Sequence, residues 1–259
     1  MKIVRNTARI AETQASNLLA APVDSLTEFD ATILARVAET LLATVLLVEH
    51  SHWVAAAGTT RQLFELLVNM EHVKSYASRE TAIATYETFA DFQQKRRRIE
   101  MFKIIRESGV TDHVKQEEGY VAELNEDRFK QFSERIDKKS QAPVWAKSWS
   151  GHSIYELCKL SPEPIRRAQY NALFAEWSEL AHAAPGAVIP AAPTELSRTM
   201  YKSVHTEANL KGSELLDFAL RFMIDIWHLL PAKPLMDPHL VVFHWESEAR
   251  LLADQISHS

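Results

Sequence analysis

The feature that most constrains this chain is the absence of proline from residues 23–142. Proline interrupts helices, so a long proline-free stretch is typical of long helices. Glycine usage agrees, because only 6 of 259 residues are glycine, and sheet proteins and glycine-loop nucleotide folds need it in their turns. We therefore predict an all-α protein, a single-domain multi-helix bundle with long antiparallel helices.

Apolar spacing and breaker residues predict the order of the elements. No linker is long enough to separate domains, so residues 1–259 are expected to form one helical domain. The elements expected along the chain are a short helix and loop in 1–25, a helix from about Asp30 to a break at Gly58, a second helix to about Ser78, a helix over 79–107 stopped at Gly109, a helix over about 112–139, a loop over 140–153 whose Trp145 and Trp149 pack onto the core, a helix at 153–160, a helix from Pro162 to His182, a loop over 184–193, and helices within 194–256.

Charge and cysteine usage restrict the class of partner. The chain has 29 Lys and Arg against 34 Asp and Glu, a net charge of −5, which gives no bulk attraction to nucleic acid or anionic membrane. The single Cys158 excludes an internal disulfide and a multi-cysteine zinc site. No signal-peptide core follows Met1, and the apolar run Ile33–Val48, interrupted by Arg36 and Glu39, is too short to span a bilayer. We expect a cytoplasmic protein with no membrane partner, no cofactor and no metal.

A polar stripe is predicted on the helix that runs from the break at Gly58 to about Ser78. Arg61, Glu65, Asn69 and His72 follow spacings of four, four and three, which place them on one face of a helix. One interpretation is a plain solvent face with an i,i+4 ion pair. The other is a polar stripe that faces a cleft, with Arg61 as an anion binder and Glu65 as a base or an orienting group.

A second polar group lies on the helix that begins at Pro162. Ser178 and His182 are one turn apart, and Tyr170 lies two turns earlier in the same sector. Because this helix also carries many apolar residues, these groups are either hydrogen-bonded inside the core or part of a site.

Other basic patterns permit two interpretations each. The run from Lys95 to Arg98 points around most of a helix, which favours a solvated face over RNA attraction. Arg198 with His205, and Arg221 with His228, have the spacing of the HEPN ribonuclease motif. Chance also produces such spacings, and the apolar neighbours of His228 suggest a core position.

Several motifs in order resemble a bacterial family of helical proteins known only as a domain of unknown function. The motifs are Thr60–Leu66 with its R-x-L-x-E pattern, Trp149–Gly151, Tyr170, and Ser178 with His182. The resemblance covers about residues 30–190, with the helices of 194–256 packed on that core. The family is distantly similar to HEPN-type helical proteins of abortive-infection and toxin–antitoxin systems, which cleave RNA or bind nucleotides.

The resemblance implies a site and a function. His182 would be the general acid or base, Glu65 its orienting group and Arg61 the phosphate binder, while Ser178, Tyr170 and Asn69 would bind substrate. It implies RNA or another phosphate-containing ligand, a homodimer, and a ribonuclease or phosphodiester-acting protein of phage defence or a toxin–antitoxin system. The alternative is a non-catalytic helical module with a buried polar network. Interface candidates, which a buried core helix explains equally well, are Met200, Phe218, Phe222, Met223, Ile226 and Trp227.

Overall fold

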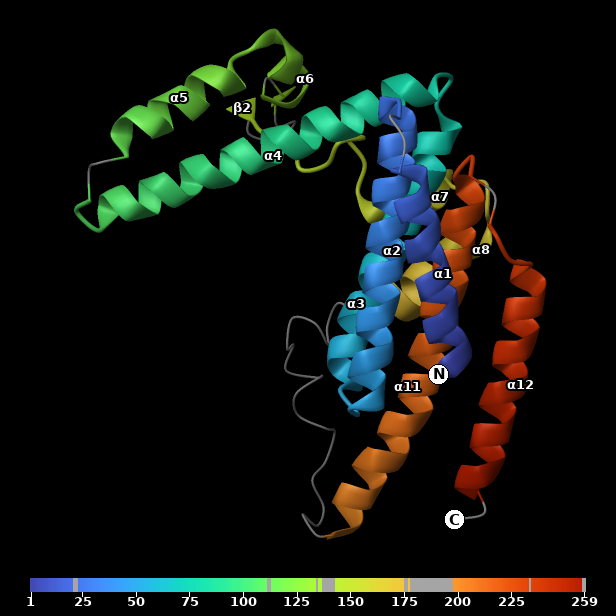
Figure 1. The fold of residues 1–259 in the computed structure, drawn as a ribbon. Helices are drawn as coiled ribbons and strands as arrows, with labels where there is room; N and C mark the ends of the chain where they lie inside the picture. The colour runs from blue at the N-terminus through green and yellow to red at the C-terminus, as the bar shows by residue number, and fades with distance from the viewer. Residues whose placement is uncertain are drawn as a thin grey trace. The chain divides into compact units, whose positions relative to one another are not determined.

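The computed structural model describes residues 1–20, 23–110, 113–133, 135–136, 143–174, 177, 198–232 and 234–257. Of residues 135–136, 143–144, 198–210, 238 and 249–257 it describes the backbone alone. Contacts within the chain form two compact units, Met1–Ser75 with Leu157–Ser259, and Tyr76–Glu156. We call the first the bundle and the second the hairpin unit, and describe each by itself (Figure 1).

Long helices make up most of the bundle. They are α1 (Lys2–Leu18), α2 (Ser25–Glu49), α3 (Trp53–Ser75), α11 (Arg198–Leu229) and α12 (Pro238–Ser257). The first three run up and down beside one another, α11 packs against both α2 and α3, and α12 contacts α1 and α11. The predicted all-α class and long antiparallel helices are confirmed, whereas the single domain over 1–259 stays a prediction.

Local sequence explains where α2 begins and ends. The Oδ1 atom of Asp24 accepts a hydrogen bond from the Thr27 amide at 2.8 Å and so caps the helix. This hydrogen bonding lowers the pKa of the Asp24 carboxyl below its usual value. The chain turns after α2 at Ser51, whose φ is 59°. The expected break at Gly58 is wrong, because Gly58 lies inside α3 and the turn falls earlier, at Ser51.

The core of the bundle forms where α11 meets α2 and α3. The Phe222 ring lies 5.3 Å from the Phe64 ring. A Cβ at Gly212 would lie 2.8 Å from Val48 Cγ1, so glycine permits the close approach of α11 to α2. Four of the interface candidates fall in this core, because Phe222, Met223, Ile226 and Trp227 are buried. Phe218 is half-buried, and the Met200 side chain lies outside the described residues. Burial therefore makes four of them core residues, and the homodimer stays a prediction.

Helix α2 corrects the expectation that the apolar segment around Ile33–Val48 is too short to span a bilayer. By length and composition it is apolar enough to cross a membrane, and it is longer than that run. More than half of its most apolar window is buried in the structure, and α2 packs against α1, α3 and α11. A core helix passes the same test, so the bundle accounts for its apolar character. The expected absence of a membrane partner stays a prediction.

The segment before α11 is built of short pieces. Helix α7 (Ile154–Leu160) agrees with the predicted helix at 153–160, and α8 (Ile165–Gln169) continues into a π-helix, η2 (Tyr170–Phe174). The helix expected from Pro162 is therefore wrong at its start, because α8 begins only at Ile165. Before α8, Ser161 Oγ accepts a hydrogen bond from the Glu163 amide at 3.0 Å and so closes a turn.

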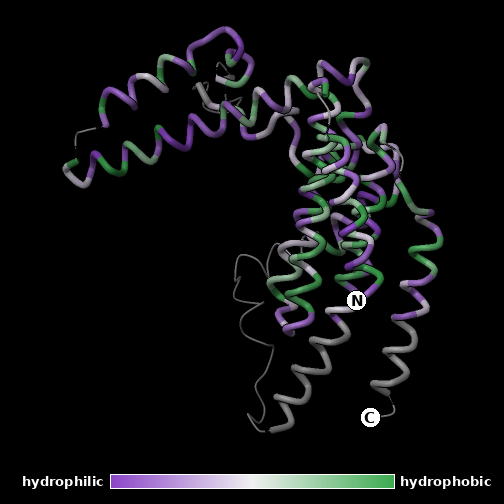
Figure 2. Tube along the Cα trace, viewed as in Figure 1, coloured by the Kyte–Doolittle hydropathy of each residue, from purple (hydrophilic) through white to green (hydrophobic). Residues whose placement is uncertain are grey.

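Two helices and a small folded end make up the hairpin unit. Helix α4 (Arg79–Glu107) is followed by a turn at Gly109, with φ 91°, as predicted, and α5 (Val114–Leu124) packs along α4. Short elements follow, namely a 3₁₀ turn (Asp127–Phe129), α6 (Lys130–Ser133), and the antiparallel strand pair β1 (Arg135–Ile136) and β2 (Pro143–Val144). Hydrophilic residues recur along both α4 and α5 (Figure 2).

An aromatic core explains why the helix expected over 112–139 is wrong. After α5 ends, the chain turns back so that the Phe132 ring lies 5.6 Å and the Phe129 ring 6.0 Å from the Phe92 ring of α4. A straight continuation of α5 would not make these contacts. The loop tryptophans pack inward as predicted, and Trp149 is buried beside the rings of Tyr76 and Tyr86. Burial raises the pKa of the Tyr86 phenol.

Candidate functional site

The predicted polar stripe on α3 forms an ion pair. Arg61 Nε donates to Glu65 Oε1 at 3.0 Å, and both side chains are partly exposed. One turn on, Asn69 Nδ2 donates to the Glu65 carbonyl oxygen at 2.6 Å. No hydrogen bond in the described part of the chain uses Nη1 or Nη2 of Arg61. Its two terminal nitrogens are therefore the donors that remain for a ligand.

The π-helix brings Tyr170 to this ion pair through Phe174. The Arg61 guanidinium carbon lies 4.6 Å from the centre of the Phe174 ring, and Tyr170 stacks on the same ring at 4.8 Å. An aromatic face holds a guanidinium in a fixed plane and adds a cation–π attraction. We call Arg61, Glu65, Tyr170 and Phe174 the Arg61 cluster. Phe174 is a member that sequence reasoning missed.

Two of the predicted residues are not placed by the structure. Ser178 and His182 lie outside the described residues, so their distance from the Arg61 cluster stays a prediction. The cluster thus unites Arg61, Glu65 and Tyr170 from segments far apart in the sequence, with Asn69 beside them. A π-helix is rare and often marks a functional position, which gives this cluster a second, independent signal.

A buried ion-pair network lies further along α3, and sequence reasoning missed it. Arg166 Nε donates to Glu71 Oε1 at 2.8 Å, and its Nη2 donates to Asp225 Oδ2 at 2.7 Å. The side chains of Arg166 and Glu71 are 6% and 3% exposed. Ser161 Oγ donates to Glu71 Oε2 at 2.7 Å, and Arg166 Nη1 donates to Gln169 Oε1 at 3.0 Å. We call these residues the Arg166 network.

A signal for this network was present in the sequence. Glu71 follows Phe64 and Leu67 at helical spacing, so a carboxylate stands on the apolar stripe of α3, where it needs a cation. Burial opposes the charge of Arg166, but the hydrogen bonds to Glu71 and Asp225 outweigh it and raise the pKa of the guanidinium. Burial, together with the Glu71 charge, also raises the pKa of the Cys158 thiol to about 11. The Cys158 thiol is thus protonated at neutral pH, the form that reacts poorly.

A groove of about 990 Å³ lies among α3, the α7–α8 segment, α11 and α12, and it is lined by four members of the Arg166 network, Glu71, Arg166, Gln169 and Asp225. Arg221, Asp225 and His228 contribute a polar stripe of α11 to this groove, and Arg221 Nη2 donates to Glu246 Oε1 of α12 at 2.7 Å. The suggested core position of His228 is wrong, because its side chain is exposed at the groove. Its partner by spacing, Arg221, lines the same groove. The side chains of Arg198 and His205 lie outside those described.

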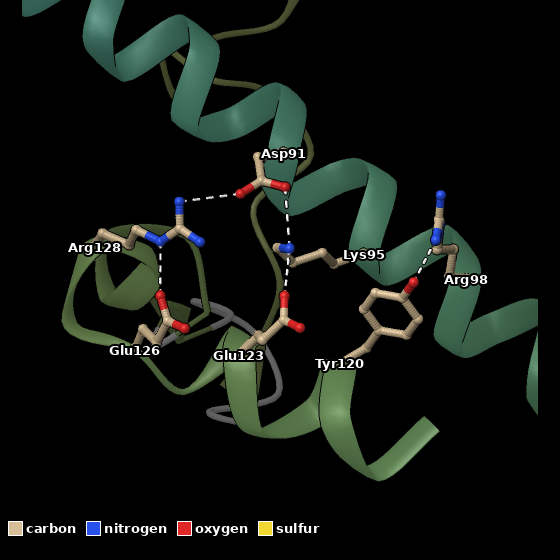
Figure 3. A network of polar contacts seen from close by, with 7 residues as sticks. All are labelled: Asp91, Lys95, Arg98, Tyr120, Glu123, Glu126 and Arg128. Atoms are coloured by element: carbon tan, nitrogen blue, oxygen red, sulfur yellow. Dashed lines mark hydrogen bonds and ion pairs between the residues drawn. The ribbon is translucent and has the colours of Figure 1, made fainter. Parts of the chain in front are cut away.

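In the hairpin unit, most side chains of the basic run Lys95–Arg98 already pair with other residues of the unit (Figure 3). Lys95 hydrogen-bonds with Glu123 and pairs with Asp91 at 3.3 Å, while Arg98 donates to Tyr120. Arg128 bridges Asp91 and Glu126 on the same face. Arg96 pairs with Glu100 and lies over Trp145, so Arg97 is the one exposed member without a partner among the described residues. This arrangement favours the solvated-face interpretation over an RNA groove.

No group of three His, Cys, Asp or Glu side chains in the described part of the chain is placed to hold a metal ion. The expected absence of a metal stays a prediction.

Comparison with known proteins identifies a family. The model of the Family of unknown function (DUF5677) matches residues 31–189. This range is more than half of the chain and confirms the resemblance, drawn from the ordered motifs, to a domain of unknown function over about 30–190. The finer likeness to HEPN-type proteins and the bacterial origin stay predictions. No curated protein and no solved structure matches the chain.

Proposed function

The chain belongs to the DUF5677 family of unknown function, and since that membership assigns no chemistry, we propose that the Arg61 cluster binds a phosphate-containing ligand and that the protein cleaves phosphodiesters, with RNA as the substrate class. The observation that carries the proposal is the position of Arg61. Its Nε is held by Glu65 and its plane by Phe174, while Nη1 and Nη2 point to no described partner. This is the geometry of a preorganised oxyanion binder.

The reaction we propose divides the work among six side chains. Arg61 binds the phosphate oxygens, and Tyr170, stacked on Phe174, adds an aromatic and hydroxyl contact to the substrate. His182 takes the proton of the ribose 2′-hydroxyl, whose oxygen forms a bond to phosphorus as the bond to the 5′-oxygen breaks and that oxygen receives a proton. Glu65 orients the imidazole, and Ser178 and Asn69 contact the substrate. A metal-independent ribonuclease of this kind fits the phage-defence or toxin–antitoxin role expected from the HEPN likeness.

The direct test is RNA cleavage by the pure protein. A fluorescein-labelled single-stranded RNA should be cut by the wild type, leaving 2′,3′-cyclic phosphate ends. His182→Ala should lower the rate by about 10²–10⁴-fold, the usual contribution of a general acid or base. Arg61→Gln should weaken RNA binding as well as cleavage. Expression of the wild type, and not of His182→Ala, should slow the growth of a bacterial host.

A matched control separates the site from general charge loss. Arg36→Gln removes an exposed arginine of α2 that is paired with Glu39 at 3.0 Å and should leave RNA binding and cleavage unchanged. Equal loss in Arg36→Gln and Arg61→Gln would contradict the Arg61 cluster as the site. Intact RNA after incubation with wild-type protein, with no effect on growth, would contradict the enzyme.

A stability measurement tests whether Arg61 and His182 share one pocket. Arg61→Ala leaves Glu65 without its cation and weakens its hold on His182, so the double variant should lose less stability than the sum of the single ones. The expected coupling is about 0.5–3 kcal/mol, and additivity within about 0.3–0.5 kcal/mol would place the two residues apart. Urea unfolding of the two single variants and the double variant measures it.

A second candidate function, a non-catalytic helical module, is supported by one observation. The Arg166–Glu71 pair is buried, and its hydrogen-bonding groups have partners in Asp225, Gln169 and Ser161, which is the behaviour of a polar network that fixes helix register. Under this function His182→Ala lowers thermal stability without changing any activity. Cleavage assays and melting curves of the same variant therefore separate the two candidates.

A further inference from the structure

We propose that the Arg166 network positions Tyr170 for the ligand of the Arg61 cluster, with Gln169 as the link between the two sets of residues. Both sets lie within the bundle. The proposal rests on the proposed function, in which the Arg61 cluster binds a phosphate-containing ligand. It makes Gln169 a positioning residue, because Gln169 acts through Arg166 and through its neighbour Tyr170 rather than on the ligand itself.

The backbone joins the two sets of residues without a break. Helix α8 ends at Gln169, and the π-helix η2 begins at the next residue, Tyr170. The Tyr170 amide donates to the carbonyl oxygens of Arg166 and Arg167, and the backbone of Tyr170 stays in the right-handed helical region. The position of Tyr170 is therefore set by the last turn of α8, which is the turn that carries Arg166.

Arg166 holds that turn against two long helices. Its Nε donates to Glu71 of α3 at 2.8 Å and its Nη2 donates to Asp225 of α11 at 2.7 Å, while its Nη1 donates to Gln169 Oε1 at 3.0 Å. A guanidinium is planar and rigid, so hydrogen bonds from three different nitrogens hold it in one orientation. The side chain of Gln169 is thus bound by a group that is itself anchored to α3 and α11.

Aromatic contacts anchor the other end of the π-helix. Phe174, the last residue of η2, is buried, and its ring lies 5.8 Å from the Phe64 ring of α3. The Arg61 guanidinium lies over the Phe174 ring, and Tyr170 stacks on the same ring at 4.8 Å with an angle of 20° between the two planes. Tyr170, which is half-buried, therefore directly follows one anchor, Gln169, while its ring rests on the other.

Anchors at both ends prepare the Tyr170 ring for binding. A functional side chain is precise only when neighbouring residues lock its position, and a ring that is already in place loses less conformational freedom when a ligand binds. Gln169 and Phe174 supply this support at the two ends of the five-residue π-helix. Because Gln169 is only half-buried, loss of its link to Arg166 should leave the core intact and release the Tyr170 ring.

Nuclear magnetic resonance of the full chain, labelled with ¹³C in its tyrosine rings, tests the positioning directly. The chain has 6 tyrosines, and the signals missing from Tyr170→Phe identify those of Tyr170. Stacking on Phe174 shifts these signals upfield, and Phe174→Leu gives their position without the ring. Gln169→Met removes the acceptor of Arg166 Nη1 and should move the Tyr170 signals toward that reference. Gln169→Glu keeps an acceptor and should leave them near their wild-type position.

A second variant and a matched control make this result specific. Glu71→Leu combined with Arg166→Met removes the donor instead of the acceptor and replaces the buried pair by apolar groups, an exchange that is often neutral or better for stability. It should move the Tyr170 signals in the same direction as Gln169→Met does. Arg167→Met changes an exposed side chain of the same helix and should leave the Tyr170 signals in place.

RNA binding connects the position of Tyr170 to the ligand. Fluorescence anisotropy with the fluorescein-labelled single-stranded RNA should show that Gln169→Met binds about two- to tenfold more weakly than the wild type, the range that one hydrogen bond supports. Gln169→Glu should bind RNA nearly as tightly as the wild type.

The proposal is overturned if the Tyr170 signals of Gln169→Met stay at their wild-type position, or if Arg167→Met or Gln169→Glu moves them as far. It is also overturned if the signals of Gln169→Met move while its RNA binding equals that of the wild type. If the wild type binds no RNA, the proposed function fails, whereas the Tyr170 signals still decide whether the Arg166 network positions this ring.

Discussion

The bundle and the hairpin unit each hold a basic side chain between two carboxylates, yet the two arrangements differ in burial. Arg166 lies between Glu71 and Asp225, and the pair it forms with Glu71 is almost fully buried. Lys95 lies between Asp91 and Glu123, whose side chains are 33% and 41% exposed. In the folded chain, water reaches both carboxylates of the hairpin-unit set. In the bundle it reaches Asp225, which is 41% exposed, but it is excluded from the Arg166–Glu71 pair.

The comparison shows that the geometry of an ion pair does not by itself determine how much the pair contributes to the free energy of unfolding. A buried charge that loses its partner pays its full desolvation cost, whereas an exposed charge recovers its hydration. The Arg166 network therefore stabilises the packing of α3, α8 and α11. The pairs of Lys95 with Asp91 and Glu123 add a small, salt-sensitive attraction between α4 and α5. Three predictions test this difference, and a fourth tests an exposed charge at the start of α2; they follow in order of decreasing effect.

The largest effect is expected for Arg166→Met. The change leaves the Glu71 carboxylate buried without a cation, which costs about 3–5 kcal/mol of unfolding free energy. Urea unfolding measures the loss. Arg167→Met is the control, because Arg167 is exposed on the same helix and its replacement should change stability by no more than about 0.5 kcal/mol. Equal losses in the two variants would remove the distinction between buried and exposed charge.

A second change should repair part of that loss. Combining Glu71→Leu with Arg166→Met removes both members of the buried pair and leaves apolar groups in their place, an exchange that is often neutral or better. The double variant should be more stable than Arg166→Met alone, with a coupling of about 0.5–3 kcal/mol between the two sites. Losses that simply add would mean that Glu71 is not the group stranded by the first change.

In the hairpin unit the corresponding variant should have a small effect. Lys95→Met should cost no more than about 1 kcal/mol, and added salt should reduce the difference from wild type. The hydrogen bond with Glu123 raises the pKa of Lys95, so its contribution is present below the ordinary lysine pKa and is lost as pH rises through the raised one. Lys103→Met, an exposed change on the same helix, is the reference in parallel melts. A loss as large as that of Arg166→Met would contradict the comparison.

The smallest effect is a pH dependence at the start of α2. Hydrogen bonds from Thr27 lower the pKa of Asp24, so this cap stabilises the protein above the ordinary Asp pKa and loses its effect as pH falls through the lowered value. Asp24→Asn keeps a capping oxygen but does not titrate. Melting temperatures from pH 7 to pH 3 should therefore fall more steeply for the wild type than for the variant. Parallel curves would show that the Asp24 charge adds nothing.

Much of the fold and of the family follows from local sequence. The proline-free stretch predicted long helices, and Gly109 marked the end of α4. The i,i+4 spacing of Arg61 and Glu65 predicted their contact, because a regular helix sets that distance by itself. The ordered motifs likewise indicated the family, whose model matches residues 31–189.

Only the tertiary structure decided which distant residues meet. Glu71, Arg166 and Asp225 lie far apart in the chain, and no spacing relates them; their contact depends on how α3, α8 and α11 pack. The end of α5 and the ring of Phe174 over Arg61 were decided in the same way, by aromatic contacts that outweigh local helix propensity. Sequence periodicity describes the face of one helix, whereas a site or a groove depends on the faces of several.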